Sequence, residues 1–220
     1  MTQFFVISGS HGVGKTTVAA LVRDILKERG VTTTTFHHRA DKAAIMGVSR
    51  NEQSNRPSWK RTLWRMIPAF LRAWVIAAND ELHYARSVSK RVLAATEDGQ
   101  PAISDRYIYD RLVDLHLHGR SRQQISTVGL ACRLMRKPDM TFLLTDLPER
   151  IHARKDELTV TQIAEYQSAL TSLFIRLRIP YREIEVAGRE AAAVAVEIVT
   201  YIENSHQTGA NHRQDKPNSA

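Results

Sequence analysis

The sequence has a single cysteine, Cys132, and no long run of apolar residues. One cysteine cannot form an internal disulfide. The apolar run near the N-terminus covers only residues 4–7, which is too short for the hydrophobic region of a signal peptide. A membrane-spanning helix needs about 20 apolar residues, and Arg72 interrupts the best candidate, residues 66–78. These absences predict a cytoplasmic protein without a spanning helix.

No block of consecutive basic residues is present, although the net charge is +8. A charge of this size attracts anions without selecting among nucleotides, nucleic acids and lipid surfaces. The arginines are dispersed, and no helix-turn-helix or RNA-binding signature accompanies them. Residues 59–74 interleave tryptophan with basic residues, which suits either a membrane-surface helix or a helix packed near a substrate pocket. We expect a small-molecule partner, and neither nucleic acid nor membrane.

The chain alternates short apolar segments with amphipathic ones. Strand patterns occupy residues 4–7, 31–36, 102–104, 141–144 and 181–186. Helical spacing covers residues 17–29, 59–96 with a break at Pro68, 162–177 and 190–202. Strands that alternate with helices form a parallel sheet covered on both sides. We therefore predict one α/β domain over residues 1–203, followed by a disordered tail at 204–220, which has almost no apolar residues.

A glycine-rich loop joins the first predicted strand to the first predicted helix. Backbone N–H groups at a helix N-terminus bind phosphates, and glycines let the backbone approach them closely. The lysine of such a loop contacts the β- and γ-phosphates, and the hydroxyl after it binds Mg²⁺. We expect His11 to contribute only its backbone amide, and we include Thr17 in the nucleotide site. The loop consists of Gly9, Ser10, His11, Gly12, Val13, Gly14, Lys15 and Thr16.

Asp105 and Arg106 follow the third predicted strand. The carboxyl end of that strand lies beside the phosphate loop in a parallel sheet, so Asp105 can position magnesium-bound water together with Thr16. The chain lacks the glutamate that ATP-driven motors place after this acid, and it lacks the Asn-Lys-x-Asp motif of guanine-nucleotide switches. Arg106 suits a phosphorylated acceptor instead. Asp105 and Arg106 therefore favour phosphoryl transfer over hydrolysis. The alternative interpretation is that these two residues form only a surface ion pair.

A short basic helix is predicted after Asp146. Proline near the first turn is typical of a helix start, and Arg150 and Arg154 lie one turn apart on the same face. These arginines, with Lys155, can form a lid that closes over the phosphates and spreads the charge of the transition state. A solvated basic helix face is the alternative interpretation.

These motifs resemble the thymidylate kinase family of nucleoside monophosphate kinases. The similarity spans most of the first 203 residues and is carried by residues 9–17, 77–80, 105–107 and 137–144. The resemblance implies a three-layer P-loop NTPase fold with a five-stranded parallel sheet in the order 2-3-1-4-5. It also implies ATP with Mg²⁺ as donor and, in many members, a homodimer. Arg154 would correspond to the lid arginine, and the segment ending at Gly188 to the loop near the adenine.

The acceptor side resembles the family less closely. Arg39 keeps the arginine of that region, and we expect Arg39, Arg106, Tyr107 and Asp110 to line the acceptor site. A carboxylate at Asp110 would repel an acceptor phosphate unless an arginine offsets it, which predicts that thymidine monophosphate (dTMP) is a poor substrate.

Three functions follow from the sequence. We expect transfer of the γ-phosphoryl group of ATP to a (deoxy)nucleoside monophosphate such as dTMP. The first alternative is a P-loop kinase that acts on another small metabolite or a sugar. The second is a non-catalytic ATP-binding regulatory module, which the changed acceptor motif favours and the intact Asp105 and Arg106 disfavour.

Overall fold

The computed structural model describes residues 3–37, 100–119 and 122–214, together with a few residues between 68 and 94. Arg39 lies outside the described residues, as do the three tryptophans, Trp59, Trp64 and Trp74. The predicted roles of Arg39 and of the tryptophan-rich helix are therefore not addressed by the structure.

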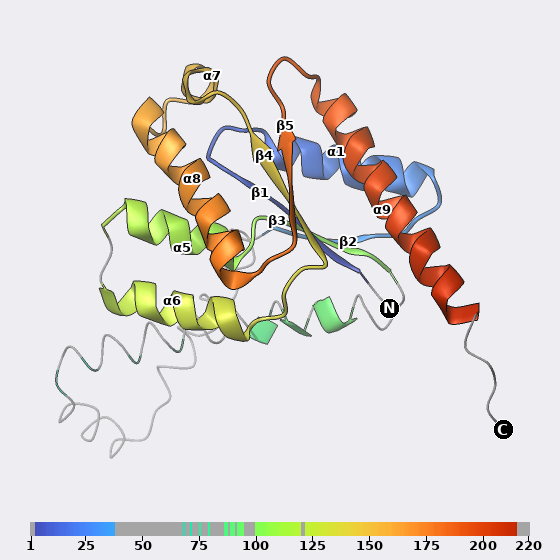
Figure 1. The fold of residues 1–220 in the computed structure, drawn as a ribbon, viewed down its shortest axis with the longest axis horizontal. Coiled ribbons are helices and arrows are strands. Elements are labelled where there is room, and N and C mark those ends of the chain that lie inside the picture. The colour runs from blue at the N-terminus through green and yellow to red at the C-terminus, as the bar shows by residue number, and fades with distance from the viewer. Residues whose placement is uncertain are drawn as a thin grey trace, which may run out of the picture.

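Five parallel strands form the central sheet in the order β2-β3-β1-β4-β5 (Figure 1). They are β1 (Phe4–Gly9), β2 (Thr34–His37), β3 (Ala102–Asp105), β4 (Met140–Thr145) and β5 (Tyr181–Glu185). Every residue of β1 and β3 is buried, which explains their near-continuous apolar sequences. The predicted α/β fold and strand order are confirmed.

Helices cover both faces of the sheet. Helices α1 (Lys15–Glu28) and α9 (Ala191–Gln214) pack together on one face. Helices α5 (Ile108–Leu117), α6 (Arg122–Leu134) and α8 (Val160–Leu177) form the layer on the other face (Figure 1). The short helix α7 (Pro148–Arg154) packs on α8 near the carboxyl ends of the strands. Within the described part of the chain, no helix is long and apolar enough to cross a membrane.

An aromatic cluster joins the sheet to α5 and α8. The ring of Tyr107 packs edge-on against Phe4 and Tyr109, with ring centroids 5.2 Å apart in both pairs. Tyr109 continues the cluster to Phe174 of α8. Tyr107 is fully buried, and its hydroxyl donates a hydrogen bond of 2.9 Å to the carbonyl of Arg136. Tyr107 thus occupies a core position in place of the predicted acceptor contact, because its ring packs against Phe4 and Tyr109.

Helix α9 is longer than the sequence predicts. Its expected end is Ile202, whereas the helix runs to Gln214, so 204–214 is helical instead of part of a disordered tail. A helix that is already packed gains one hydrogen bond for each residue added, which offsets weak helix propensity. Ser205 also lies beside the N-terminal segment, with its Oγ 3.0 Å from Oε1 of Gln3. Residues 215–220 lie outside the described part of the chain.

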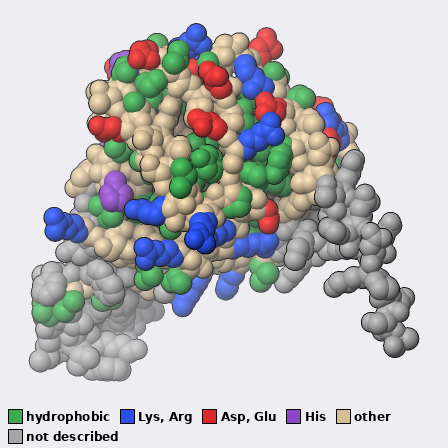
Figure 2. Space-filling view, in the orientation of Figure 1, with side chains coloured by type: hydrophobic (Ala, Val, Ile, Leu, Met, Phe, Trp, Pro, Cys, Tyr) green, Lys and Arg blue, Asp and Glu red, His purple; other side chains and the backbone are tan. Residues whose placement is uncertain are grey.

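The surface charge is unevenly distributed. On the face shown in Figure 2, lysine and arginine side chains gather over α6 and the end of α8, two helices with basic residues in their last turns. Acidic side chains lie mainly in the upper half of this face. Part of the net charge of +8 therefore lies at the opposite end of the strands from the phosphate loop.

Candidate active site at the phosphate loop

The phosphate loop connects β1 to α1 and leaves Lys15 as the first residue of the helix. Gly12 and Gly14 have φ angles of 84° and 101°, a left-handed conformation that favours glycine. This conformation brings the loop backbone to the N-terminus of α1, where the free N–H groups and the helix dipole favour an anion. The geometry matches the predicted phosphate site.

Lys15 is buried within the loop. Its Nζ donates hydrogen bonds of 2.6 Å to the carbonyl oxygens of Gly9 and Ser10. Burial, and after it the positive charge of Arg106, lowers the pKa of Lys15 to about 8, although nearby carboxylates oppose the shift. The loop therefore holds a partly desolvated ammonium group, which interacts more strongly with a phosphate than an exposed one would.

Thr16 and Asp105 come together across the sheet. The hydroxyl of Thr16 donates a hydrogen bond of 2.8 Å to Oδ2 of Asp105. The parallel register pairs Asp105 with Ile7 of β1, which places the end of β3 beside the loop. A hydroxyl and a carboxylate at this spacing supply the hard oxygen ligands that Mg²⁺ prefers. The structure thus brings together the two predicted metal-binding residues, and their chemistry fits the ion.

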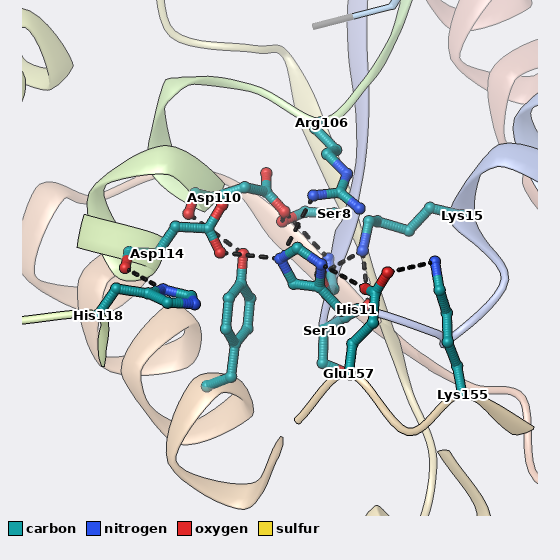
Figure 3. A network of polar contacts seen from close by, with 12 residues as sticks. Ser8, Ser10, His11, Lys15, Arg106, Asp110, Asp114, His118, Lys155 and Glu157 are labelled. Carbon is teal, nitrogen blue, oxygen red and sulfur yellow. Dashed lines mark hydrogen bonds and ion pairs between the residues drawn. The ribbon is translucent and has the colours of Figure 1, made fainter. Parts of the chain in front are cut away.

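Arg106 turns toward the phosphate loop. Its backbone has a φ of 71°, which is uncommon for a residue other than glycine, and its N–H donates to the carbonyl of Ile7 at 3.0 Å. Such backbone conformations cost roughly 1–3 kcal/mol and cluster at functional sites. The guanidinium Nη1 lies 3.5 Å from Nε2 of His11 (Figure 3). The strained turn therefore directs the predicted catalytic arginine to the site.

Asp110 faces the inside of the molecule. Its carboxylate accepts hydrogen bonds from the Ser8 hydroxyl at 3.0 Å and from the Tyr107 backbone N–H at 3.1 Å. The residue is 1% exposed, and burial raises the pKa of its carboxyl. Asp110 thus links the start of α5 to β1 through hydrogen bonds. This buried position takes the place of the predicted contact with an acceptor. The predicted repulsion of a dTMP phosphate, which required an acceptor-facing carboxylate, no longer has a structural basis.

The predicted lid is helix α7 and the loop that follows it. Arg154 forms an ion pair with the buried Asp146, which follows β4. A side chain built at Gly188 would lie 4.0 Å from Nη1 of Arg150, so these two predicted nucleotide contacts are neighbours. Arg154 pairs with Asp146 in this structure, and its role at the phosphates remains a prediction.

Helix α7 packs directly on Gly12 of the phosphate loop. A Cβ atom at Gly12 would lie 3.1 Å from Cβ of Lys155 and 3.2 Å from Cγ2 of Ile151. A Cβ atom at Gly14 would meet nothing within 4 Å. A side chain is strained at both positions because both have a positive φ, and the two positions differ in the space available for it.

Replacing Gly12 by alanine is expected to lower the free energy of unfolding by about 1 kcal/mol more than Gly14→Ala does, because only the first substitution crowds α7. Urea unfolding of both variants without nucleotide measures the difference. Equal destabilisation would show that α7 does not rest on the loop in solution.

His11 has side-chain partners that the sequence does not reveal. Its Nε2 lies 2.9 Å from Oδ1 of Asp114, and its Nδ1 lies 3.3 Å from Oε2 of Glu157. The three residues come from the phosphate loop, from α5 and from the loop between α7 and α8 (Figure 3). Asp114 and Glu157 are distant from His11 in the chain, so no local sequence pattern links the three residues.

Comparisons with known proteins agree with this architecture. No family model matches the chain. The probable thymidylate kinase of Thermococcus kodakarensis is 26% identical over 216 residues, covering 91% of this chain and 97% of that protein. The probable thymidylate kinase of Thermococcus onnurineus is also 26% identical, covering 92% and 98%.

A solved structure has the same fold. The thymidylate kinase of Candida albicans superposes with a TM-score of 0.63 at 18% sequence identity, covering 93% of this chain and 92% of that one. Its published description mentions broad substrate specificity for that enzyme. With the phosphate loop and the strand order, these similarities indicate a P-loop kinase that resembles the thymidylate kinases in sequence and fold.

Proposed function

We propose that the chain transfers the γ-phosphoryl group of ATP to a nucleoside monophosphate such as dTMP. The observation that carries the proposal is the hydrogen bond of 2.8 Å between Thr16 and Asp105, with Arg106 turned toward the same loop. This arrangement joins a triphosphate-binding loop, a metal-binding pair and a cation for a phosphorylated acceptor. The names of the relatives favour dTMP as the first acceptor to test.

On the donor side, the amides of the phosphate loop and the ammonium of Lys15 bind the β- and γ-phosphates. Thr16 and Asp105 would hold Mg²⁺, which neutralises charge on these phosphates when it is bound. Glycine at position 12 leaves room for α7 to lie against the loop, which excludes water from the phosphates. Water exclusion favours transfer to the acceptor over hydrolysis.

On the acceptor side, Arg106 is the described residue best placed to neutralise an acceptor phosphate. Arg154 contributes after its guanidinium group leaves Asp146 and pairs with a phosphate. The side chain of Arg154 is half exposed, so it has room to make this change. Arg39 completes the set as predicted from the sequence. In-line attack by a phosphate oxygen needs no general base of its own, so positioning and charge neutralisation supply the catalysis.

Asp105→Asn is expected to lower kcat about 10²-fold and to raise the Mg²⁺ concentration required for half-maximal activity, because the amide binds the cation more weakly. Thr16→Val should raise the Mg²⁺ requirement in the same direction. Steady-state rates across a Mg²⁺ titration measure both effects. Asp24→Asn, which removes an exposed carboxylate elsewhere on α1, is the matched control. An unchanged Mg²⁺ requirement in both site variants would remove the metal-binding role.

The proposed function is tested by measuring ADP formation from Mg-ATP with a panel of nucleoside monophosphates and phosphosugars. Stimulation by dTMP or by another nucleoside monophosphate supports the proposal. Stimulation by a phosphosugar alone would assign the chain to the metabolite-kinase alternative. ADP formation that no acceptor stimulates would favour the ATP-binding regulatory module.

A further inference from the structure

Asp114 of α5 is a charged side chain at the site to which the proposed function assigns no role. It lies one helical turn after Asp110 on the same helix. The two carboxyls differ in exposure, since Asp110 is 1% exposed whereas the side chain of Asp114 is 30% exposed. Asp110 therefore belongs to the core, and Asp114 can be reached by a ligand.

Asp114 lies close to the arginine that the proposed function assigns to the acceptor phosphate. Its Oδ1 is 2.9 Å from Nε2 of His11, and Nη1 of Arg106 is 3.5 Å from the same nitrogen. Figure 3 shows the carboxylate and the guanidinium group meeting this one ring. The two groups are therefore close enough for one small ligand to contact both.

The carboxyl of Asp114 is held in its ionised form. Burial raises its pKa, but the hydrogen bond from His11, the charge of Arg106 and the hydrogen bond from Tyr166 outweigh burial, so the pKa is lowered overall. An ionised carboxylate donates no hydrogen bond and has acceptor positions for about four. His11 and Tyr166 each use one of these positions, so the group can also accept hydrogen bonds from a ligand.

Buried groups fix the position of Asp114. Tyr166 of α8 is fully buried, and its hydroxyl contacts both the Asp114 carboxyl and the backbone carbonyl of Asp110, which lies 3.1 Å away. The ring of Tyr166 also packs edge-on against His11, with ring centroids 5.7 Å apart. A carboxylate that is already ordered loses little conformational entropy when it binds a ligand, so its hydrogen bonds can discriminate between acceptors.

Glu157 is the other carboxylate beside His11, but it is less suited to an acceptor. It lies in the loop that follows α7, on the lid side of the site, and its Oε1 is 3.0 Å from Nζ of Lys155. A carboxylate that is paired with an ammonium group gains less from a neutral donor than one without such a partner. Asp114, on the helix that follows Arg106, is therefore the carboxylate that we expect at the acceptor.

The opposite charges of Arg106 and Asp114 suit the sugar-phosphate end of a nucleotide. Arg106 attracts an acceptor phosphate, whereas Asp114 repels the phosphate and attracts hydrogen-bond donors. In a nucleoside 5′-monophosphate the sugar directly follows the phosphate, so a phosphate on Arg106 brings the sugar hydroxyls toward Asp114. A ribose presents two neighbouring hydroxyl donors and a 2′-deoxyribose presents one. Dinucleotide-binding folds likewise use a carboxylate to bind the 2′-hydroxyl of a ribose.

We propose that Asp114 is a specificity-determining residue of the acceptor site that accepts hydrogen bonds from the hydroxyls of a ribose. The inference rests on the proposed function and narrows its substrate class to ribonucleoside monophosphates in preference to their 2′-deoxy counterparts. A deoxynucleotide such as dTMP offers this carboxylate one donor fewer. A site that is built to bind a hydroxyl discriminates against the analogue that lacks it, because the polar group of the site then loses its partner.

Acceptors that differ only in the 2′-hydroxyl test the proposal, such as uridine and 2′-deoxyuridine monophosphate and the corresponding cytidine, adenosine and guanosine pairs. With the pair that best stimulates ADP formation, the native protein should have a kcat/KM about 10- to 100-fold higher for the ribonucleotide. This ratio should fall to within about threefold of one in Asp114→Ala and to an intermediate value in Asp114→Asn. Both acceptors are measured on the same protein, so any loss of stability cancels in the ratio. A native ratio near one, or a native ratio retained in Asp114→Ala, would overturn the proposal.

Glu157→Gln is the matched control. It removes the same charge from a second neighbour of the His11 ring, whose Nδ1 lies 3.3 Å from Oε2 of Glu157, but on the lid side of the site. This variant should keep the native preference for the ribonucleotide. Loss of the preference in Glu157→Gln as well as in Asp114→Asn would assign the effect to the position of His11 and reject a direct contact between Asp114 and the acceptor.

Acceptor binding separates this inference from the proposed kinase activity. Calorimetric titration of the same acceptor pairs into protein with Mg²⁺ and a non-hydrolysable ATP analogue requires no phosphoryl transfer. Tighter binding of the ribonucleotide by the native protein, lost in Asp114→Ala, would support the role of Asp114 even if no ADP forms. Equal affinities within each pair, or no binding of either member, would refute that role even if the protein is an active kinase.

Discussion

Replacing Lys15 by alanine is expected to lower kcat for phosphoryl transfer at least about 10³-fold, because the cation at the γ-phosphate is lost. The ammonium group donates hydrogen bonds of 2.6 Å to the carbonyl oxygens of Gly9 and Ser10, which fix its position within the phosphate loop. The pKa of about 8 shows that burial already disfavours this charge. Removing it should therefore leave the folded state stable, and the loss should be one of catalysis.

Two measurements accompany the rate of Lys15→Ala. Thermal unfolding without nucleotide should remain close to that of the native protein, which separates lost chemistry from lost structure. Lys27→Ala, an exposed lysine in the last turn of the same helix, should keep the native rate. Activity in Lys15→Ala above about a tenth of the native rate would contradict the assignment of the phosphate loop.

Asp110→Ala is expected to lower the free energy of unfolding by about 3 kcal/mol, which would be the largest stability effect among these variants. The substitution leaves the Ser8 hydroxyl and the Tyr107 N–H without their buried acceptor. Asp110→Asn keeps one carbonyl oxygen and should lose less. Urea unfolding of the two variants gives the ranking, and a loss below about 1 kcal/mol in Asp110→Ala would reject the structural role.

The pH dependence of Asp110→Asn gives an independent check on this carboxyl. Burial raises its pKa, although Lys15, the Tyr107 N–H and Arg106 oppose the shift. The folded protein therefore binds this proton more tightly than the unfolded chain does. The stability that Asp110 contributes is present below its unfolded pKa and is lost as the pH rises through the folded value. The native protein should exceed Asp110→Asn in stability by more near pH 5 than near pH 8.

The elements that the sequence predicts well are those encoded over a few residues. The phosphate loop combines a buried strand, three glycines and Lys15 within one short segment, so its geometry follows from local chemistry. The start of α7 follows likewise from Pro148. The order of the strands came instead from the family resemblance, because periodicity does not specify which strands are neighbours.

The parts that the sequence does not predict depend on tertiary packing. The family resemblance around the motif at 105–107 predicts that Asp110 faces an acceptor, but the first turn of α5 directs its carboxylate inward to Ser8. His11 was given a backbone role because its partners, Asp114 and Glu157, are distant in the chain. Charged residues acquire their function from whichever elements fold against them, and a single sequence does not contain that information in local form.

Identification of the phosphorylated product by ³¹P NMR tests whether the protein transfers the γ-phosphoryl group to a nucleoside monophosphate. Native protein, Mg-ATP and dTMP, or the nucleoside monophosphate that best stimulates ADP formation, are followed together. We expect equal amounts of ADP and the nucleoside diphosphate, with little inorganic phosphate, and no product from Lys15→Ala. Release of inorganic phosphate in place of the nucleoside diphosphate would contradict phosphoryl transfer.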